Sequence, residues 1–574
     1  MSVRYDQGHF QTIILSLCGL LYATQASALT EMVFEDTFGR RVNEHGLILL
    51  DWEGQIANPA IQVYVKPPAD AAFPGQAIIS STEPRLYFDL PSDATATGPA
   101  KTMSFPDATT TVPFFVAIFP DRDTQSEDHV LSVQFTDANG IQRIQALNLH
   151  VIDQDSASPP PFNVIVDFTQ DQTGFFDDPV KRGIVQQAAQ DWAYFFADMN
   201  LDMVPAGAEE TFIWDPDGFN SGNFIHNTSA YRGFLLYAYG IDSATQPYRS
   251  GGEPSATGGF QSSGGTPLPL RRSGGVEIEI KGNFNTLGWF LTSTDDDWWK
   301  ASNFGNEQND LYSIARHEIG HSLIFNPAHT RFGQFKSAGS VQDAQVLAYQ
   351  GSYPGIDSSD HLNGSIDRLS KKGAFGYEYF GDVPARRWLI TKLDVLVAQA
   401  IGYTLRQTSA FIPLQIVSTG VPRGALSTFY WQQMTATGGI PAYDWSVISG
   451  ALPGGLSLDP FSGVISGTPN ALGTFNFTIR LRDNDSVTTP LTRPLSIRIE
   501  ATPFEITAVQ KGGADIQIKF TTAQNHNYRV DYKNDLADSW TTLIDGVPGT
   551  GGIVPVTDSN AATLGKRFYQ VTEL

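Results

Sequence analysis

The chain has 574 residues, which is too long for a single hydrophobic core and indicates roughly three to five domains. It carries 60 acidic residues against 37 lysines and arginines, so its formal net charge is −23 at pH 7. Nucleic acids and anionic lipid surfaces are bound by clustered Lys and Arg, so this charge excludes both as expected partners. Acidity of this kind keeps an extracellular protein dispersed.

The first 28 residues have the features of a cleaved signal peptide. An apolar run from Thr12 to Ala23 is shorter than a membrane span needs, and Ala26-Ser27-Ala28 supplies the small residues of a cleavage site. No later stretch is long and apolar enough to span a bilayer, so we expect a secreted protein. The only cysteine, Cys18, lies in this segment, so we expect no disulfide in the mature chain.

Residues 30–155 are predicted to form a β-sandwich of the immunoglobulin-like kind. Short alternating runs such as Ile61–Lys66, Pro113–Ile118 and Val130–Phe135 are separated by Gly, Pro, Asp and Asn at intervals that suit a sandwich. Residues 156–161 are rich in Ser and Pro and read as a stiff linker. We find no motif with evident chemistry in this region.

The pattern changes beyond the linker, where we place an α+β domain over residues 162–408. Phe162–Phe168 reads as a buried strand, and the segment after Asp178-Pro179 has the apolar spacing of a helix. Gly275–Lys281 reads as another strand, which comes before the motif described next and could offer an edge to an extended peptide. An ordinary sheet strand is the alternative.

The segment Asp310-Leu-Tyr-Ser-Ile-Ala-Arg-His-Glu-Ile-Gly-His-Ser-Leu-Ile-Phe-Asn326 reads as a helix that Asp310 or Asn309 can cap. His317 and His321 lie one turn apart on the same face, because residues four apart are neighbours on a helix. Two imidazoles presented in this way can hold one metal ion. Glu318 follows the first histidine, the position from which a carboxylate can reach a metal-bound water as general base.

The alternative is that the two histidines pack in a core or face solvent. Histidine supplies 10 of the 574 residues, and a chance match to the full pattern, in which a glutamate must also follow the first histidine, has odds on the order of one in a hundred. The capping residues and apolar positions of the segment make the helix credible in its own right. These signals favour the metal-binding interpretation.

Beyond the motif helix, Asp360–Asp367 is a polar turn and Gly373–Trp388 is an aromatic loop. Thr391–Gly402 reads as a short helix that ends at its glycine. Residues 409–501 return to β alternation with turn dipeptides. Residues 502–574 are predicted to form a further small β-module that resembles fibronectin-like domains.

Three phrases in residues 409–501 carry a specific resemblance. Gly438–Val447, Leu452–Asp459 and Gly463–Pro469 resemble the immunoglobulin-like, cadherin-like repeat that is common in bacterial exported proteins. The resemblance covers about ninety residues. It implies an all-β sandwich at this place in the chain.

The helical motif resembles that of zincin metallopeptidases, most of all their metzincin and leishmanolysin-like branches, in which a third histidine follows the helix. In the compact metzincin version a glycine stands where this chain has Ile324, and the third histidine falls where it has Pro327. This sequence departs from that version. The metzincin branch also has a methionine under the metal, and here no methionine occurs between Met203 and Met434.

A catalytic zinc usually takes three protein ligands, so a third donor is expected downstream. His329 and His361 lie eight and forty residues after His321. The segment Leu393-Asp-Val-Leu-Val-Ala-Gln-Ala-Ile-Gly-Tyr403 resembles exported bacterial peptidases of the matrixin-like and leishmanolysin-like kind, in which an insertion separates the motif from the third ligand. This resemblance places His361 ahead of His329, with Glu378 as an outside choice.

The resemblance implies a secreted zinc-dependent endopeptidase that hydrolyses peptide bonds of a protein or peptide substrate. His317, His321 and His361 would bind Zn²⁺, and Glu318 would be the general base for a metal-activated water. Tyr377 or Tyr379 could donate a hydrogen bond to the oxyanion, with aromatic packing as the alternative. The expected fold is a multidomain chain in which an α+β zincin-like domain is flanked by all-β immunoglobulin-like modules.

A second function class stays open: a cell-surface adhesion or matrix-binding protein whose zincin-like domain is catalytically silent and whose β-modules make the contacts. Glu318 favours catalysis, because a silent domain has no need of it. Calcium is a second candidate ion, with Asp295-Asp296-Asp297 as the obvious acidic run. Residues 30–155 could also be an inhibitory prodomain, although without cysteine they cannot block zinc through a thiol.

Overall fold

The structure is a computed structural model that describes residues 30–88, 100–156, 164–169, 171, 173–198, 203, 205–207, 209–213, 222–226, 229–231, 233–242, 273–281, 289–291, 309–327, 329–376, 388–485, 487–500, 505–524, 526–564 and 566–574. The predicted signal peptide with Cys18, the acidic run Asp295–Asp297, and Tyr377, Glu378 and Tyr379 lie outside these residues.

The first sandwich, residues 30–153, consists of two sheets whose strands alternate between buried and exposed side chains, as in β3. Within each sheet the strands pair antiparallel, except that β2 runs parallel to β9. One sheet contains β1 (Val33–Glu35), β3 (Ile61–Lys66), β7 (Val112–Ile118) and β5 (Leu86–Tyr87). The other contains β2 (Leu47–Asp51), β9 (Gln142–Asp153), β8 (Glu127–Thr136), β4 (Gly75–Ser80) and β6 (Ala100–Phe105).

The helical domain, residues 164–405, contains a parallel sheet and five α-helices among its described residues. The sheet consists of β10 (Val164–Asp167), β14 (Phe234–Asp242) and β15 (Ser273–Lys281). The helices are α1 (Pro179–Ala193), α2 (Leu311–Leu323), α3 (Thr330–Ala338), α4 (Ala344–Gln350) and α5 (Lys392–Ala400). Shorter pairs are β11 (Phe196–Asp198) with β18 (Thr404–Leu405), β12 (Glu209–Ile213) with β13 (Gly222–His226), and β16 (Trp289–Phe290) with β17 (Asn309–Asp310).

Several of these elements were predicted, among them β10, α1, β15, α2 and α5. α1 begins at Pro179 behind the cap Asp178, and β10 lies inside the predicted strand. The motif helix α2 is capped by Asp310, whose side chain accepts a hydrogen bond from the Tyr312 amide. It ends at Leu323, earlier than expected, because the chain turns before Asn326-Pro327 and a residue that precedes proline disfavours helical geometry.

The second sandwich, residues 414–500, and the terminal module, residues 506–573, are all β. The second sandwich contains β20 (Gly424–Ala425), β27 (Leu491–Glu500), β26 (Gly473–Arg482) and β23 (Asp444–Gly450) in one sheet, β21 (Tyr430–Gln433), β25 (Val464–Gly467) and β24 (Leu456–Leu458) in another, and the pair β19 (Gln415–Ile416) with β22 (Ala436–Thr437). The terminal module contains β28 (Ile506–Gly512), β29 (Asp515–Thr521) and β32 (Ile553–Asp558), facing β31 (Thr541–Pro548), β30 (Asn527–Lys533) and β33 (Phe568–Glu573).

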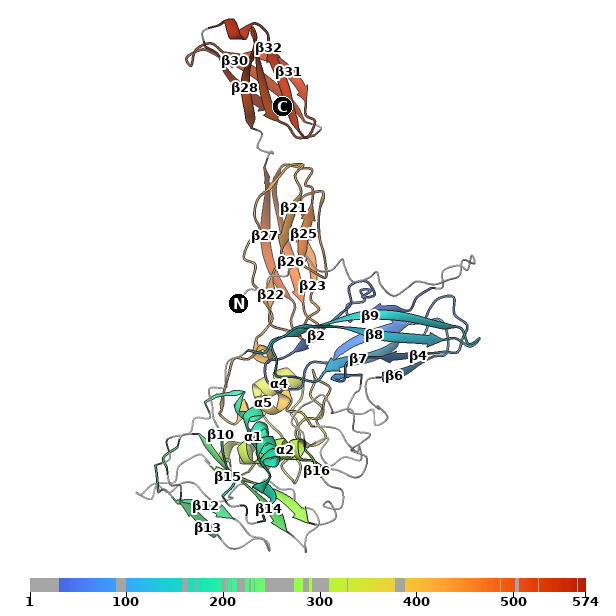
Figure 1. Cartoon of the computed structure of the whole chain (residues 1–574), viewed down its shortest axis with the longest axis vertical. Helices are drawn as coiled ribbons and strands as arrows, with labels where there is room; N and C mark the ends of the chain where they lie inside the picture. Colours follow the sequence, from blue (N-terminus) through green and yellow to red (C-terminus); the bar gives the residue numbers. More distant parts are fainter. Residues whose placement is uncertain are drawn as a thin grey trace.

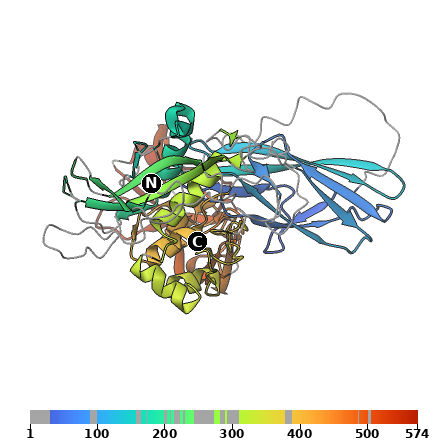
Figure 2. The ribbon, with the colours of Figure 1, turned by 90° about the horizontal axis from the view of Figure 1, so that it is seen from below.

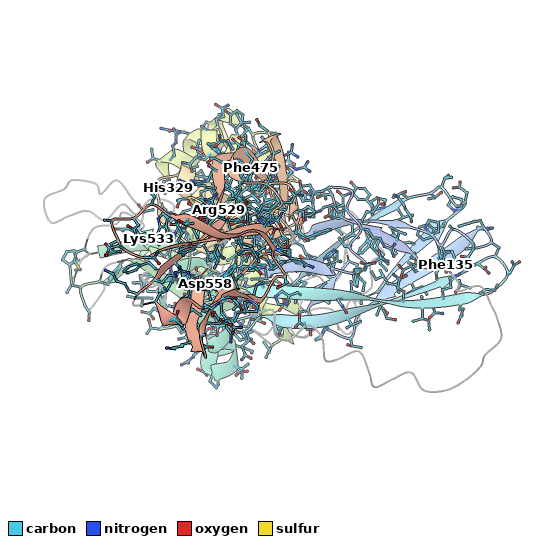
Figure 3. The ribbon with its side chains drawn as sticks, turned by 90° about the horizontal axis from the view of Figure 1, so that it is seen from above. Phe135, His329, Phe475, Arg529, Lys533 and Asp558 are labelled. Atoms are coloured by element: carbon cyan, nitrogen blue, oxygen red, sulfur yellow. The ribbon has the colours of Figure 1, made fainter. Side chains whose placement is uncertain are left out.

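The first sandwich and the helical domain share one hydrophobic core, which includes Trp52 and Ile56 on one side and Trp388 and Ile390 on the other. The Ala57 amide donates to Ile390 O over 2.8 Å, which adds a backbone link. The second sandwich and the terminal module have cores of their own. The first sandwich projects to one side of the molecule (Figures 1 and 2), and Phe135 lies in the part of it that points away from the other domains (Figure 3).

Polar contacts join the second sandwich to its neighbours. Arg368 of the helical domain binds both carboxylate oxygens of Asp485, with Nη2 2.8 Å from Oδ2. Arg40 of the first sandwich donates to Tyr443 O over 3.0 Å and to Pro460 O over 2.7 Å.

Taken together, these elements make the chain a multidomain, mostly β protein. Within its described residues, no helix combines the length and the apolarity that crossing a bilayer requires.

Candidate metal centre

Three histidines from two parts of the helical domain converge on one point. α2 presents His317 and His321 from successive turns, and the polar turn after α4 brings His361 to face them. Nε2 of His361 lies 3.2 Å from Nε2 of His321 and 3.3 Å from Nε2 of His317. The structure thus brings together the three histidines that the sequence singled out.

In His321 and His361 the ring nitrogens that face the cluster carry lone pairs. Nδ1 of His321 lies 3.1 Å from Phe325 O, and Nδ1 of His361 lies 3.5 Å from Asp357 Oδ2, so these nitrogens hold the ring protons. Burial lowers the pKa of His321 to about 4 and lowers the pKa of His317 and of His361 as well. Neutral imidazoles therefore present Nε2 atoms that attract a cation rather than one another.

The donor set fits Zn²⁺. Zinc binds imidazole nitrogen at about 2.0–2.1 Å in tetrahedral geometry, so two such nitrogens are expected about 3.3–3.4 Å apart. The two separations quoted above, 3.2 and 3.3 Å, agree with this value. Three imidazoles leave the fourth position for water or substrate, which is the arrangement of catalytic zinc sites.

An aromatic ring, Phe375, supports all three imidazoles. It stacks on His317 with a centroid distance of 4.5 Å and an interplanar angle of 3°, and it lies edge-on to His321 at 4.7 Å. Its centroid is 5.7 Å from that of His361. Asp394 at the start of α5 accepts a hydrogen bond from the Phe375 amide over 2.9 Å, so α5 fixes the position of this ring. Burial raises the pKa of Asp394 to about 7.

A buried ion pair holds α2 from behind. Arg316, adjacent to His317, donates to Asp191 Oδ2 over 2.8 Å and to the Tyr312 hydroxyl over 2.6 Å. Burial opposes the charge of Asp191, but Arg316 and Arg122 outweigh it and hold its pKa below the ordinary value. Trp192 of α1 donates to Arg316 O over 2.7 Å. These contacts fix the rotation of α2 and so the direction of its histidines.

The far end of α2 is held by the closing segment of the domain. The Tyr403 hydroxyl donates to Leu323 O over 2.5 Å, which satisfies one of the carbonyls that a helix leaves open at its C-terminus. Glu318 lies on the same helix, next to His317, and only 1 % of its surface is exposed. His321 and His361 are partly exposed, so the histidine cluster is open to solvent on their side.

The other histidine candidate lies elsewhere. His329 is the residue before α3, and its ring centroid is 6.0 Å from that of Tyr403. It does not belong to the group formed by His317, His321 and His361 among the described residues. Phe375 and Asp357 were not predicted. Only the four-residue spacing between Asp357 and His361 could have indicated the second of them.

A family model described as "Putative Ig domain" matches residues 409–498, which coincide with the predicted immunoglobulin-like module. The fold is thus that of a multidomain chain with immunoglobulin-like sandwiches. No curated protein matches the chain.

Several solved structures share short stretches with the chain. A "putative alpha-galactosidase" of Bacteroides fragilis is 27% identical over 16% of this chain and 18% of its own, with a TM-score of 0.14. Protocadherin gammaB7 EC3-6 is 11% identical over 28% and 47%, with a TM-score of 0.16, and human CDH23 EC21-23 is 16% identical over 28% and 63%, with a TM-score of 0.14. The chain therefore spans less than a fifth of the first of these.

Proposed function

We propose that the protein is a secreted zinc-dependent endopeptidase whose catalytic unit is the helical domain, with a zincin-like site on α2. The observation that supports this most is the convergence of three imidazoles at the spacing of zinc ligands, with the buried Glu318 next to His317 on α2. Nitrogen donors suit zinc better than calcium or magnesium.

His317, His321 and His361 would hold the ion. When bound, Zn²⁺ supplies a positive charge that lowers the pKa of water at the open position and polarises a substrate carbonyl. Glu318 takes the proton from the attacking water as its oxygen bonds to the scissile carbon, and then delivers that proton to the amine nitrogen as the C–N bond breaks. Because Glu318 is buried, its carboxylate can hold this proton away from bulk solvent.

The neighbouring strand offers a way to bind an extended peptide. β15 pairs with β14 on one side and has no strand on its other side within the described part of the sheet. α2 packs against β15, so the strand that has this unpaired edge lies beside the motif helix. A peptide that adds to this edge would gain main-chain hydrogen bonds that do not depend on its sequence.

The first prediction is that Glu318→Gln leaves zinc bound and removes hydrolysis. Loss of a general base lowers the rate by about 10²–10⁴-fold, whereas the three histidines are untouched. Casein hydrolysis and the zinc content of the purified protein are the two measurements. Glu44→Gln, on the exposed surface of the first sandwich, is the matched control and should keep both. Full activity of Glu318→Gln would contradict the proposal.

The adhesion alternative has one supporting observation. Phe429 and Trp431 are 68 % and 57 % exposed on or beside β21 of the second sandwich, and exposed aromatic side chains are typical of binding surfaces. Zinc bound by the wild-type protein without cleavage of casein or of a broad peptide library would favour this alternative over the peptidase.

A further inference from the structure

A second group of ligands lies where the first sandwich meets the helical domain. Asp51 and Asp153 are paired residues at the ends of the parallel strands β2 and β9, and Asp121 follows β7. One carboxylate oxygen of each lies within 4.8 Å of the others. Calcium binds oxygen at about 2.3–2.6 Å, so two oxygens around one ion are at most about 5 Å apart. The three carboxylates meet this condition.

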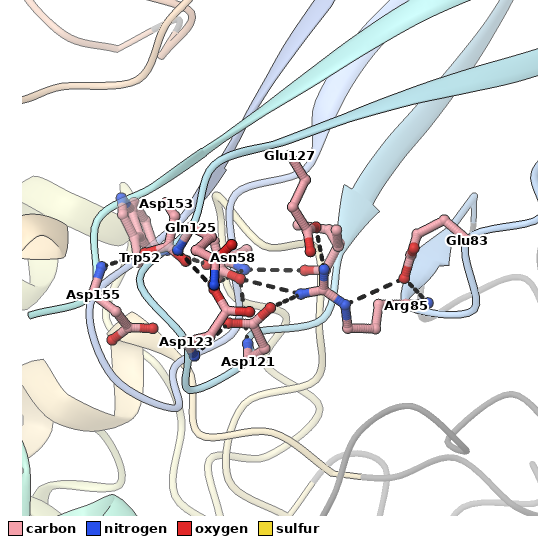
Figure 4. A network of polar contacts seen from close by, with 12 residues as sticks. Trp52, Asn58, Glu83, Arg85, Asp121, Asp123, Gln125, Glu127, Asp153 and Asp155 are labelled. Atoms are coloured by element: carbon pink, nitrogen blue, oxygen red, sulfur yellow. Dashed lines mark hydrogen bonds and ion pairs between the residues drawn. The ribbon is translucent and has the colours of Figure 1, made fainter. Parts of the chain in front are cut away.

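Two further carboxylates surround this group (Figure 4). The side chain of Asp123 lies within hydrogen-bonding distance of Asp153, and Asp155 Oδ1 accepts the Gly54 amide over 2.7 Å. Arg85 lies on one side, where it contacts Asp121 and is 3.6 Å from Asp51 Oδ2. The same guanidinium also pairs with Glu83 and Glu127, so it cannot balance the five aspartates.

Independent of the carboxylates, a buried amide points to a missing ligand. Gln55 is 4 % exposed, and its Nε2 donates to the backbone carbonyl of Asp121. Its Oε1 is buried and has no hydrogen-bond partner among the described residues. A buried amide oxygen without a partner costs about 1–3 kcal/mol, and a cation beside the Asp121 loop would remove that cost.

The electrostatics of the group support the same conclusion. Burial, together with neighbouring carboxylates, raises the pKa of Asp153 to about 6 and that of Asp155 to about 7. Burial also raises the pKa of Asp51 and of Asp121. Each of these groups is therefore costly to ionise in its place, and a bound divalent cation would favour the ionised forms.

We propose that Asp51, Asp121 and Asp153, with Asp123, Asp155 and Gln55 around them, bind one calcium ion at the end of the first sandwich that faces the helical domain. All candidate donors are oxygens, which suit calcium or magnesium better than zinc. They come from loops and strand ends of differing geometry, which suits the flexible coordination of calcium better than the strict octahedron of magnesium.

A chain of side-chain contacts connects this site to the metal centre. Arg122 follows Asp121, contacts the Tyr312 hydroxyl of α2 and lies 3.4 Å from Asp191 Oδ1 of α1. A cation that holds the Asp121 loop therefore also holds Arg122 against the two helices behind the histidines. This inference does not depend on peptidase activity, because it concerns a different ligand set and a different ion.

The test measures calcium binding in the full chain with the histidine cluster disabled by His317→Ala and His321→Ala, so that zinc does not contribute. Calorimetric titration of the metal-stripped protein should show one calcium ion bound with a Kd between about 10⁻⁶ and 10⁻³ M, and a melting temperature that rises with calcium. Asp153→Asn should weaken binding at least about tenfold, and Glu44→Gln should not.

Asp123→Asn is a second variant, because this side chain is exposed and its loss leaves the buried hydrogen bonds in place. It should weaken binding as well, even if Asp153→Asn fails to fold. Absence of calcium binding by the folded parent, tighter binding of magnesium than of calcium, or unchanged affinity in Asp123→Asn would overturn the proposal. Failure of the peptidase test would leave these results unaffected.

Discussion

His361 is held by a turn rather than by a helix, so its orientation depends on a few local contacts. Asp357 accepts the His361 amide over 3.0 Å through Oδ1, while its Oδ2 faces Nδ1 of the same histidine at 3.5 Å. The carboxylate thereby selects the ring tautomer that leaves Nε2 free for a metal. Asp357 is in this sense a positioning residue for the proposed centre.

The second prediction concerns this contact. Asp357→Asn should weaken zinc binding about 10–100-fold, because the amide keeps the turn but loses the charge that orients the imidazole. Zinc competition with a chromogenic chelator measures the affinity. At saturating zinc the casein-cleaving rate should recover, which a general folding defect would prevent. Asp360→Asn, in the same turn but paired with Lys336, is the control and should keep the affinity of the wild type.

The third prediction concerns pH. Burial lowers the pKa of His321 to about 4, whereas an unfolded histidine has a pKa near 6.5. Between these values the unfolded chain binds a proton that the folded chain does not. The stability is therefore complete above pH 6.5 and is lost as the pH falls toward 4, by about 2–3 kcal/mol from this residue.

Urea unfolding of the zinc-free protein at pH 7 and pH 4.5 measures this loss. The variant His321→Gln lacks the titrating group and should show a smaller decrease. The raised pKa of Asp394 affects stability in the opposite direction, because the folded chain then binds a proton that the unfolded chain does not. The informative quantity is therefore the difference between wild type and variant in the pH dependence of stability, rather than either pH dependence alone. Identical slopes would contradict the prediction.

At the scale of elements, the helix caps explain how much of the domain could be predicted. Asp310 before α2 and Thr391 with Asp394 at α5 form caps at the ends that the sequence indicated. The helices α3 and α4 were not predicted, although Gly339 and Gly351 end them in left-handed conformation. Both are short and have few buried positions, so their periodicity gives little signal.

The candidate site, like the helices, could be predicted from the sequence only in part. His317, Glu318 and His321 follow from a local spacing on one helix, and His361 from a resemblance in the segment after it. Phe375 could not be predicted, because its contacts with the histidines depend on how a long loop returns to α2. Its role depends on tertiary packing alone, which no periodic pattern records.

The fourth prediction compares two glycines in helices. A Cβ at Gly320 of α2 would lie 2.5 Å from Cε2 of Phe375, whereas a Cβ at Gly183 of α1 would meet nothing within 4 Å. Gly320→Ala should therefore lower the free energy of unfolding by about 1–3 kcal/mol and weaken zinc binding, because Phe375 must move. Gly183→Ala should raise it by about 0.5–1 kcal/mol. Chemical unfolding measures both, and stabilisation by both alanines would contradict the packing argument.

At the scale of the whole molecule, the second sandwich has a core of its own and is attached to its neighbours by charged contacts, together with Ile440 and Phe461, which pack against the core of the first sandwich and the helical domain. Arg368 and Asp485 are 17 % and 10 % exposed, so this pair is well shielded from water. Arg40 supplies a further link, at Asp444, Tyr443 and Pro460. Their geometry sets the direction of the second sandwich relative to the helical domain (Figure 1).

The fifth prediction tests this attachment. In a Glu318→Gln background, which prevents self-cleavage under the proposed function, Asp485→Ala should leave Arg368 without its bidentate partner and cost about 1–3 kcal/mol of docking energy. Calorimetry should then show the second sandwich melting at a lower temperature, and small-angle scattering should show a larger radius of gyration. Arg423→Ala removes an exposed pair with Glu500 and should change neither.

Because the first sandwich and the helical domain share a continuous core, cleavage of the connection between them by a protease would not separate them. Trp52 and Ile56 are buried against the domain, and the Ala57 and Ala60 amides donate to Ile390 and Leu369. A cut between residues 156 and 164 would therefore leave a nicked, two-chain species that stays together until it is denatured. Any maturation step that removed the first sandwich would have to expose the aromatic side chains of the helical domain that it covers.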